Sequence, residues 1–261
     1  MSSDRSTHRP GAAAEQMLVA VERDGTSDEV AVELPLEIRL NGEPVAVTMR
    51  TPGDDFALAA GFLYGEGIVT EGPQVGLTED MAGNTVEVTA PGAKPPGSRR
   101  FYTSSSCGVC GKGALEEVAV HAEPISSDLR IERGLLARLP DLMRQPAFAR
   151  SGGLHATGLF TAAGELLLVR EDVGRHNAMD KVIGQALLDG ELPLSDRVLC
   201  VSGRLAFELV QKAAVAGAPA LVGVGAPTSL AVELAEDRGL TLAGFARGES
   251  VNVYTHPERV A

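Results

Sequence analysis

The chain has 261 residues and carries 35 acidic against 23 basic side chains, which gives a formal net charge of −12. This charge argues against a nucleic-acid-binding protein, because such proteins need a basic surface that displaces counterions. No run of about 18 apolar residues occurs, so the sequence predicts no membrane span.

The composition also bears on the core and on the compartment. Tryptophan is absent and aromatic residues make up 4% of the chain, so we expect an aliphatic core. The first residues contain no apolar signal segment, and three cysteines do not suit a disulfide framework. These features indicate a cytoplasmic protein.

The first elements are predicted from alternation and turn residues. Residues 1–28 begin with a polar and then alanine-rich stretch and are expected to form a flexible tail. Apolar residues alternate from residue 29 to residue 49 around Asn41-Gly42, which is the strongest short signal for a β-hairpin.

A helix and a further strand follow this hairpin. Asp54 is expected to cap a helix that ends at Gly65. A short strand is predicted at residues 85–89, before the Pro- and Gly-rich turn segment at residues 91–98. We therefore predict a small α+β domain over residues 29–98.

The second half of the chain alternates between strand and helix patterns. Strands are predicted at residues 157–161, 166–170, 197–201, 220–224, 241–245 and 251–254, and helices at residues 135–143, 177–188, 206–216 and 228–237. Such alternation is typical of a mostly parallel sheet with helices on its faces. We expect an α/β domain over residues 114–261.

Between the two domains, residues 99–113 are rich in Gly, Ser and Thr and predict a mobile loop. This loop carries Cys107 and Cys110. Lys112 and two arginines lie nearby in the sequence and would favour the reactive thiolate. A thiolate in such a loop can accept a sulfane sulfur, and the second cysteine can assist its release. This pattern favours a sulfur carrier.

Three other interpretations of the two cysteines stay open. A structural zinc site needs a second ligand pair, and the sequence has none. A thioredoxin-like dithiol normally begins a helix within a βαβ unit, which is not the pattern here. A chance pair of surface thiols is the third. Cys200 differs from Cys107 and Cys110, because it lies within an apolar strand pattern and is expected to be buried.

Several strand ends in the second half carry Gly-rich turns. The segments are residues 151–158, 171–181, 202–204, 225–228 and 244–250. Helix N-termini at strand ends bind anions, and Arg175 and Lys181 could add phosphate contacts. Together these turns could line one crevice for a large phosphate-bearing ligand, although capped helices with solvated charges explain them equally well.

Four motifs in this order resemble those of FdhD, the formate dehydrogenase accessory sulfurtransferase family. They are residues 105–112, 153–158, 171–178 and 254–257, and the likeness covers nearly the whole chain from about Val30. The resemblance implies a cytidine-deaminase-like three-layer α/β domain, a smaller N-terminal α+β domain and a mobile cysteine loop. It also implies a cytoplasmic homodimer.

The resemblance further implies a sulfurtransferase. Cys107 would carry persulfide sulfur from a cysteine desulfurase, with Cys110 as its partner. The acceptor would be the molybdenum (or tungsten) bis(pterin guanine dinucleotide) cofactor that formate dehydrogenase requires. The family's cofactor-binding segment corresponds to Phe245, Ala246, Arg247, Gly248, Glu249 and Ser250. Two alternatives are a cofactor-binding chaperone without covalent sulfur transfer and a dithiol redox protein.

Deaminase chemistry is not expected from this fold. Zinc deaminases use His-x-Glu followed by Pro-Cys-x-x-Cys. Here Thr157 stands where the glutamate would follow His155, and no Cys-x-x-Cys comes after it. We therefore expect no zinc and assign no metal ligands.

Overall fold

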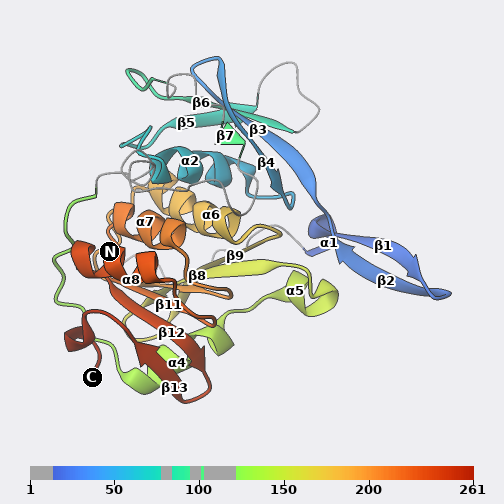
Figure 1. Ribbon diagram of the computed structural model, residues 1–261. Coiled ribbons are helices and arrows are strands. Elements are labelled where there is room, and N and C mark those ends of the chain that lie inside the picture. The colour runs from blue at the N-terminus through green and yellow to red at the C-terminus, as the bar shows by residue number, and fades with distance from the viewer. Residues whose placement is uncertain (1–13, 78–83, 95–100, 103–121) are drawn as a thin grey trace, which may run out of the picture.

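The computed structural model describes residues 14–77, 84–94, 101–102 and 122–261. These residues form a stack of layers (Figure 1). A five-stranded sheet lies at one end, followed by helix α2, then helices α6, α7 and α8, then a six-stranded sheet, with helix α4 on its far face. No helix within the described ranges is long and apolar enough to cross a membrane.

The smaller sheet has the strand order β5-β6-β3-β4-β7. Its strands are β3 (Leu34–Leu40), β4 (Glu43–Arg50), β5 (Gln74–Leu77), β6 (Thr85–Thr89) and β7 (Phe101–Tyr102). Asn41 and Gly42 join β3 to β4 with φ of 51° and 87°, as the predicted hairpin turn requires. Helix α2 (Asp55–Gly65) covers the sheet and shares an aliphatic core with it.

The larger sheet has the order β13-β12-β11-β10-β8-β9. Its strands are β8 (His155–Thr161), β9 (Leu166–Asp172), β10 (Arg197–Val201), β11 (Ala220–Gly223), β12 (Thr241–Arg247) and β13 (Ser250–Val253). Only the neighbouring pairs β10–β11 and β11–β12 are parallel. The expectation of a mostly parallel sheet is wrong, because β8–β9 and β12–β13 are hairpins whose short turns leave no room for a crossover helix.

Helices bury both faces of this sheet. Helices α6 (Arg175–Leu188), α7 (Phe207–Val215) and α8 (Ser229–Arg238) lie on one face, and α4 (Arg133–Leu142) lies on the other. Thr228 caps α8 as predicted, since its Oγ1 accepts a hydrogen bond from the backbone of Ala231. Consecutive residues of β10, Leu199 and Cys200, belong to the cores on opposite faces. The predicted three-layer α/β class is confirmed.

The two layered units meet where α2 packs against α6 at very short range. A Cβ atom on Gly61 would lie 1.9 Å from the carbonyl oxygen of Asp180, and one on Gly184 would lie 1.8 Å from that of Ala57. No side chain fits at either position. Glycine is therefore required at both positions if the backbones are to approach this closely.

The N-terminal segment differs from the expectation. Within the predicted flexible tail of residues 1–28, the structure has helix α1 (Ala14–Met17), strand β1 (Leu18–Arg23) and the start of β2 (Thr26–Ala31). The two strands form a separate hairpin (Figure 1). Its turn is Asp24-Gly25, with φ of 51° and 76°, and Asp-Gly is a local hairpin signal in the sequence.

Candidate functional site

Five strand ends meet at one edge of the six-stranded sheet. Strands β9 to β12 end there, and β8 begins there because it runs antiparallel to both of its neighbours. Backbone hydrogen bonds join the turns: Ser202 donates to Ala156 (3.0 Å), Gly225 to Gly203 (3.0 Å) and Phe245 to Gly225 (3.2 Å). The turns at residues 202–204, 225–228 and 244–250 therefore form one row, as the sequence predicted.

Cationic side chains gather at the β8–β10 end of this row. A Cβ atom on Gly203 would lie 3.5 Å from Nδ1 of His155 and 3.9 Å from Cδ of Arg175, so both side chains flank the glycine. Arg204 follows and is exposed. Burial lowers the pKa of His155, and the charges of Arg175 and Arg204 lower it further. Arg175 and Arg204 thus place two positive charges near His155, on a chain whose net charge is −12.

His176 adjoins the same cluster. Burial, followed by the charges of Arg175 and Lys212 and by His155, lowers its pKa to about 3. Its Nε2 lies 3.9 Å from a carboxylate oxygen of Glu208. The lowered pKa makes this imidazole neutral at pH 7, so the arginines supply the positive charge of the cluster.

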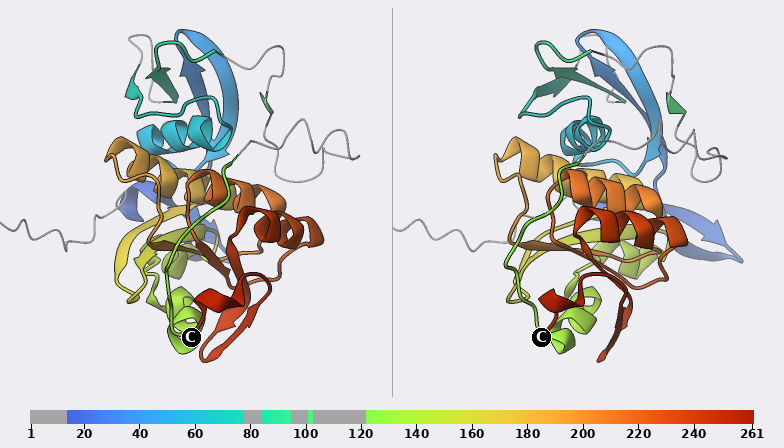
Figure 2. Two further views of the ribbon diagram at one scale, coloured as in Figure 1. Left: turned by 90° about the vertical axis from the view of Figure 1, so that its left-hand side faces the viewer. Right: turned by 60° about the vertical axis from the view of Figure 1, so that its left-hand side comes forward.

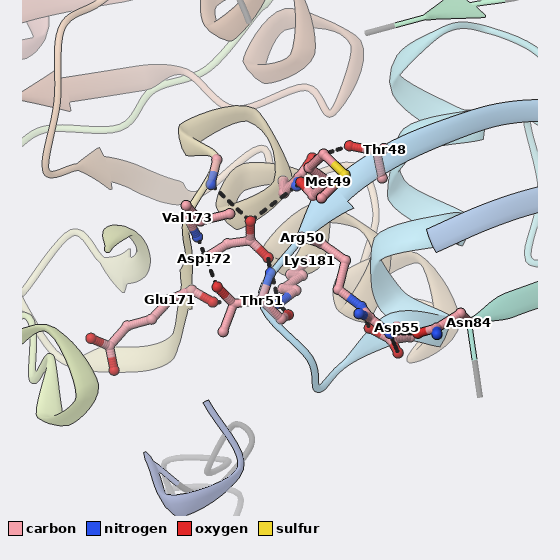
Figure 3. Close-up of polar contacts among 12 residues, drawn as sticks. Thr48, Met49, Arg50, Thr51, Asp55, Asn84, Glu171, Asp172, Val173 and Lys181 are labelled. Carbon is pink, nitrogen blue, oxygen red and sulfur yellow. Dashed lines mark hydrogen bonds and ion pairs between the residues drawn. The ribbon is translucent and has the colours of Figure 1, made fainter. Parts of the chain in front are cut away.

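Beneath the cluster lies a buried polar network, shown in Figure 3. Asp172 is fully buried, and its Oδ2 lies 2.8 Å from Nζ of Lys181 and accepts from the backbone of Thr51 (3.1 Å). Lys181 also donates to the carbonyl of Thr51 at 2.9 Å. The prediction that Lys181 contacts a phosphate is therefore wrong, because its buried ammonium group already binds Asp172 and Thr51.

Further contacts fix this network to the smaller unit. Asn177 donates to the carbonyl of Met49 at 2.8 Å. Asp54 occupies the N-cap position of α2, yet its side chain makes no capping hydrogen bond, and instead Oδ1 lies 3.1 Å from Nε of Arg170 in β9. The predicted capping role of Asp54 is wrong, since its φ of 56° belongs to the left-handed region and its carboxylate faces a buried arginine.

A second buried ion pair lies farther along α6. Nζ of Lys212 in α7 lies 2.8 Å from Oδ1 of Asp180 and 3.5 Å from Oε1 of Glu66 at the end of α2. Three helices are thus joined by one ammonium group. These paired charges hold the layers below the sheet edge in a fixed arrangement.

The predicted cofactor-binding segment forms a hairpin at the other end of the row. Strand β12 continues to Arg247, two residues beyond the expectation, and the turn is Gly248-Glu249. Phe245 has a φ of 55° at a register shift, and 48% of its surface is exposed. A left-handed non-glycine residue costs roughly 1–3 kcal/mol and is often found at functional sites. Ala246 is buried, whereas Arg247, Gly248, Glu249 and Ser250 are exposed.

Cys107 and Cys110 lie outside the described residues. On one side of their segment, Phe101 and Tyr102 pair with Ala46 and Val47 of β4. On the other side, the chain resumes at Ala122 and passes α8 before it reaches α4 (Figure 2). The segment that carries the two cysteines therefore connects the smaller sheet to the larger domain.

A cleft of about 560 Å³ lies where the described chain resumes. Its walls are residues 122–126, the end of α2, the end of α7 and the segments before β10 and β11. The amino ends of β10 and β11 border this cleft, so it lies at the opposite edge of the sheet from the cationic cluster.

Cys200 is placed as the sequence predicted. It is a free thiol in β10 with no exposed surface, and burial raises its pKa. A buried thiol of this kind is unreactive. In the described part of the chain, no three His, Cys, Asp or Glu side chains are grouped so that they could hold a metal ion.

His176 lies within the motif of residues 171–178 but was not predicted as a site residue, and Glu208 was not predicted at all. The two residues meet because α6 and α7 both begin at this edge. The signal that could have found them is the position itself, since helix N-termini next to strand ends collect at one edge of such sheets.

Comparisons with known proteins show the family of the chain. The chain matches the model of the FdhD/NarQ family over residues 31–261. It is 52% identical to the sulfur carrier protein FdhD of Streptomyces avermitilis, with 96% of this chain and 97% of the relative covered. The sulfur carrier protein FdhD of Saccharolobus solfataricus is 48% identical, with 90% of this chain and 91% of the relative covered.

A solved structure shares the fold. A formate dehydrogenase accessory protein from Desulfotalea psychrophila superposes with a TM-score of 0.72 and 28% sequence identity, over 94% of this chain and 97% of that one. The match to the family model and the close relatives both extend over most of the chain. The chain belongs to the FdhD/NarQ family.

Proposed function

We propose that the protein is a sulfur carrier that delivers sulfur to the cofactor of formate dehydrogenase. The observation that carries this proposal is the row of turns that unites Arg175, Arg204 and the hairpin of residues 245–250 at one sheet edge. A cationic edge on an acidic chain fits a large acceptor that bears phosphates. The names of the relatives, sulfur carrier protein and formate dehydrogenase accessory protein, support the same activity.

The carrier step needs only the thiolate of Cys107 and a persulfide donor. The thiolate attacks the outer sulfur of a cysteine desulfurase persulfide, so that the Cys107 Sγ–S bond forms and the S–S bond of the donor breaks. The donor leaves as a thiolate, and no oxidant or reductant is consumed. In the release step a nucleophilic group of the acceptor attacks the outer sulfur with the help of Cys110. A bond from the acceptor to this sulfur forms, the Cys107 Sγ–S bond breaks, and Cys107 leaves as its thiolate. This enzyme-like cycle makes the protein a sulfurtransferase.

The acceptor in this proposal is molybdenum (or tungsten) bis(pterin guanine dinucleotide), which is bound as a substrate. Phe245, with its exposed ring, and Arg247, with its charge, are the hairpin residues best suited to hold a base and a phosphate. Glu249 is exposed at the turn, and its carboxylate would repel phosphates. We therefore place the phosphates on the Arg247 side of the hairpin.

The proposal also includes two protein partners, a cellular compartment and an oligomeric state. The donor is a cysteine desulfurase, and the recipient of the finished cofactor is formate dehydrogenase. We propose that the protein works in the cytoplasm as a homodimer, in line with the family resemblance. A reducing compartment suits the chemistry, because a persulfide carrier needs free thiols.

The test measures activation of formate dehydrogenase by variants of the three cysteines. Cys107→Ala is expected to abolish activation, and Cys200→Ala serves as the matched control because its thiol is buried in β10. A cofactor-binding chaperone without covalent transfer predicts that Arg247→Ala is more harmful than Cys107→Ala. A dithiol redox protein predicts equal losses for Cys107→Ala and Cys110→Ala. Full activation by Cys107→Ala would disprove the carrier mechanism.

A further inference from the structure

Arg175 differs from the other cations on the neighbouring helices. Its Nε is buried and has no hydrogen-bond partner among the residues that the structure describes. Lys181, on the same helix, is fully used by Asp172 and by the carbonyl of Thr51. A buried guanidinium nitrogen without a partner costs free energy, and a bound anion would supply the missing acceptor.

The space next to this donor is kept open by Gly203. Any side chain there would contact the ring of His155 and the aliphatic stem of Arg175. Arg204 is the next residue, and its charge acts on His155 together with that of Arg175. The glycine thus leaves bare backbone between two arginines, where an anion can approach closely.

The carboxylates near this space do not occupy the arginines. Asp172 is held by Lys181 and by the backbone of Thr51 and Gly174. Glu208 lies beside His176, at 3.9 Å from its Nε2. No ion pair between either of these carboxylates and Arg175 or Arg204 is present in the described structure.

We propose that Arg175, Arg204 and His155 form a phosphate subsite over the backbone of Gly203. This subsite lies at the other end of the row from residues 245–250 and is separate from that hairpin. The proposal rests on the proposed function for the identity of the natural ligand, which would place one phosphate here and its base-bearing end near Phe245. Arg175 donates through its buried Nε, Arg204 adds a solvent-exposed charge, and His155 contributes a ring N–H.

The test is a binding titration of the whole protein with inorganic pyrophosphate, guanosine 5′-diphosphate and guanosine. Arg204→Ala and Arg175→Lys are expected to weaken binding of pyrophosphate and of the nucleotide diphosphate by about tenfold each, because each removes a charged hydrogen bond. Gly203→Val is expected to do the same by filling the space, without any change of charge. Guanosine binding should be unchanged in all three variants.

Arg144→Ala is the matched control, since Arg144 is exposed between α4 and the short helix α5 (Pro146–Ser151). Circular dichroism and thermal unfolding verify that each variant is folded, and Arg204→Ala, which changes an exposed side chain, tests the subsite even where a buried variant does not fold. Equal affinity of wild type and variants for the diphosphates would overturn the proposal, as would no binding to any of them, or an equal loss in Arg144→Ala.

Failure of the subsite and failure of the carrier function give different results. Sulfur loading on Cys107 is measured separately, by the mass of the cysteine-containing peptide. Normal loading with unchanged diphosphate binding in the variants rejects the subsite alone. Absent loading with weakened diphosphate binding in the variants rejects the carrier function and retains the subsite.

Discussion

Two positions on helix α6, six residues apart, show the difference between a structural charge and a functional one. Lys181 is 1% exposed and is matched by Asp172 and a backbone carbonyl, so every strong interaction it can offer is used within the fold. Arg175 begins the same helix at the sheet edge, and its buried Nε has no partner in the described structure. A charge that is fully paired within the fold, such as that of Lys181, indicates a structural role. A buried donor without a partner beside an open space, such as Nε of Arg175, indicates a ligand-binding role.

The largest expected effect on stability comes from removing the ion pair of Lys181 with Asp172. Lys181→Met leaves the carboxylate of Asp172 buried without its counter-ion, and loss of one partner of a buried ion pair costs about 3–5 kcal/mol. The free energy of unfolding, measured by urea denaturation, should fall by that amount. Arg175→Met on the same helix should cost less than about 1 kcal/mol, because it removes no ion pair. Equal losses in the two variants would contradict the distinction.

The second largest effect is expected at the close contact between α2 and α6. Gly184→Ala places a methyl group where the carbonyl of Ala57 lies, so α2 and α6 must separate. We expect a loss of about 2–3 kcal/mol in the free energy of unfolding, from overpacking at a rigid contact. Gly76→Ala is the control, because a Cβ at Gly76 in β5 would have no atom within 4 Å. A loss for Gly184→Ala no larger than that for Gly76→Ala would show that the close approach is not needed.

A third prediction concerns pH and the imidazole beside the cluster. The folded-state pKa of His176 is lowered to about 3, so below its usual value of about 6.5 the unfolded chain binds more protons than the folded one. Stability should therefore fall as pH drops from about 6.5 toward 3, with a contribution from this residue of about 2 kcal/mol at pH 5. His176→Gln should flatten that part of the pH profile of the free energy of unfolding. An unchanged slope would contradict the lowered pKa.

The smallest expected effect is a change in the protonation of His155 when an anion binds Arg175 and Arg204. Burial lowers the pKa of His155, and the charges of Arg175 and Arg204 lower it further, so an anion bound to these arginines should raise it again. Binding of pyrophosphate should then be accompanied by uptake of part of a proton at pH values where His155 titrates. Calorimetry in two buffers of different ionisation enthalpy measures this uptake, and His155→Gln should reduce it. The same uptake in His155→Gln would assign the proton to the ligand alone.

Much of the larger domain was predictable because its signals are local. Gly and Pro residues mark the turns between the strands. The helix that Thr228 caps lies within one residue of its predicted bounds. The strand around Cys200 and the hairpin turn at Asn41-Gly42 follow from the same short-range rules. The row of turns at the sheet edge could also be predicted, since strand direction alone brings such ends together.

The remaining features depend on contacts between distant segments. Lys181 looks like a phosphate ligand in the sequence, and only the tertiary structure shows that its ammonium group binds Asp172 and the carbonyl of Thr51. The capping role expected for Asp54 fails for the same reason, because Arg170 from another domain lies beside it. Long-range ion pairs leave no spacing pattern in one sequence. The hairpin at Asp24-Gly25 is different, since its turn signal was local and was overlooked.

The most direct test of the carrier function follows the sulfur itself. The protein is incubated with a cysteine desulfurase and ³⁴S-labelled cysteine without reductant, and its peptides are analysed by mass spectrometry. We predict one labelled sulfur on the peptide that contains Cys107, removable by reductant, and none on the peptide that contains the buried Cys200. A Cys107–Cys110 disulfide with no added sulfur, under conditions that load the desulfurase, would contradict the account.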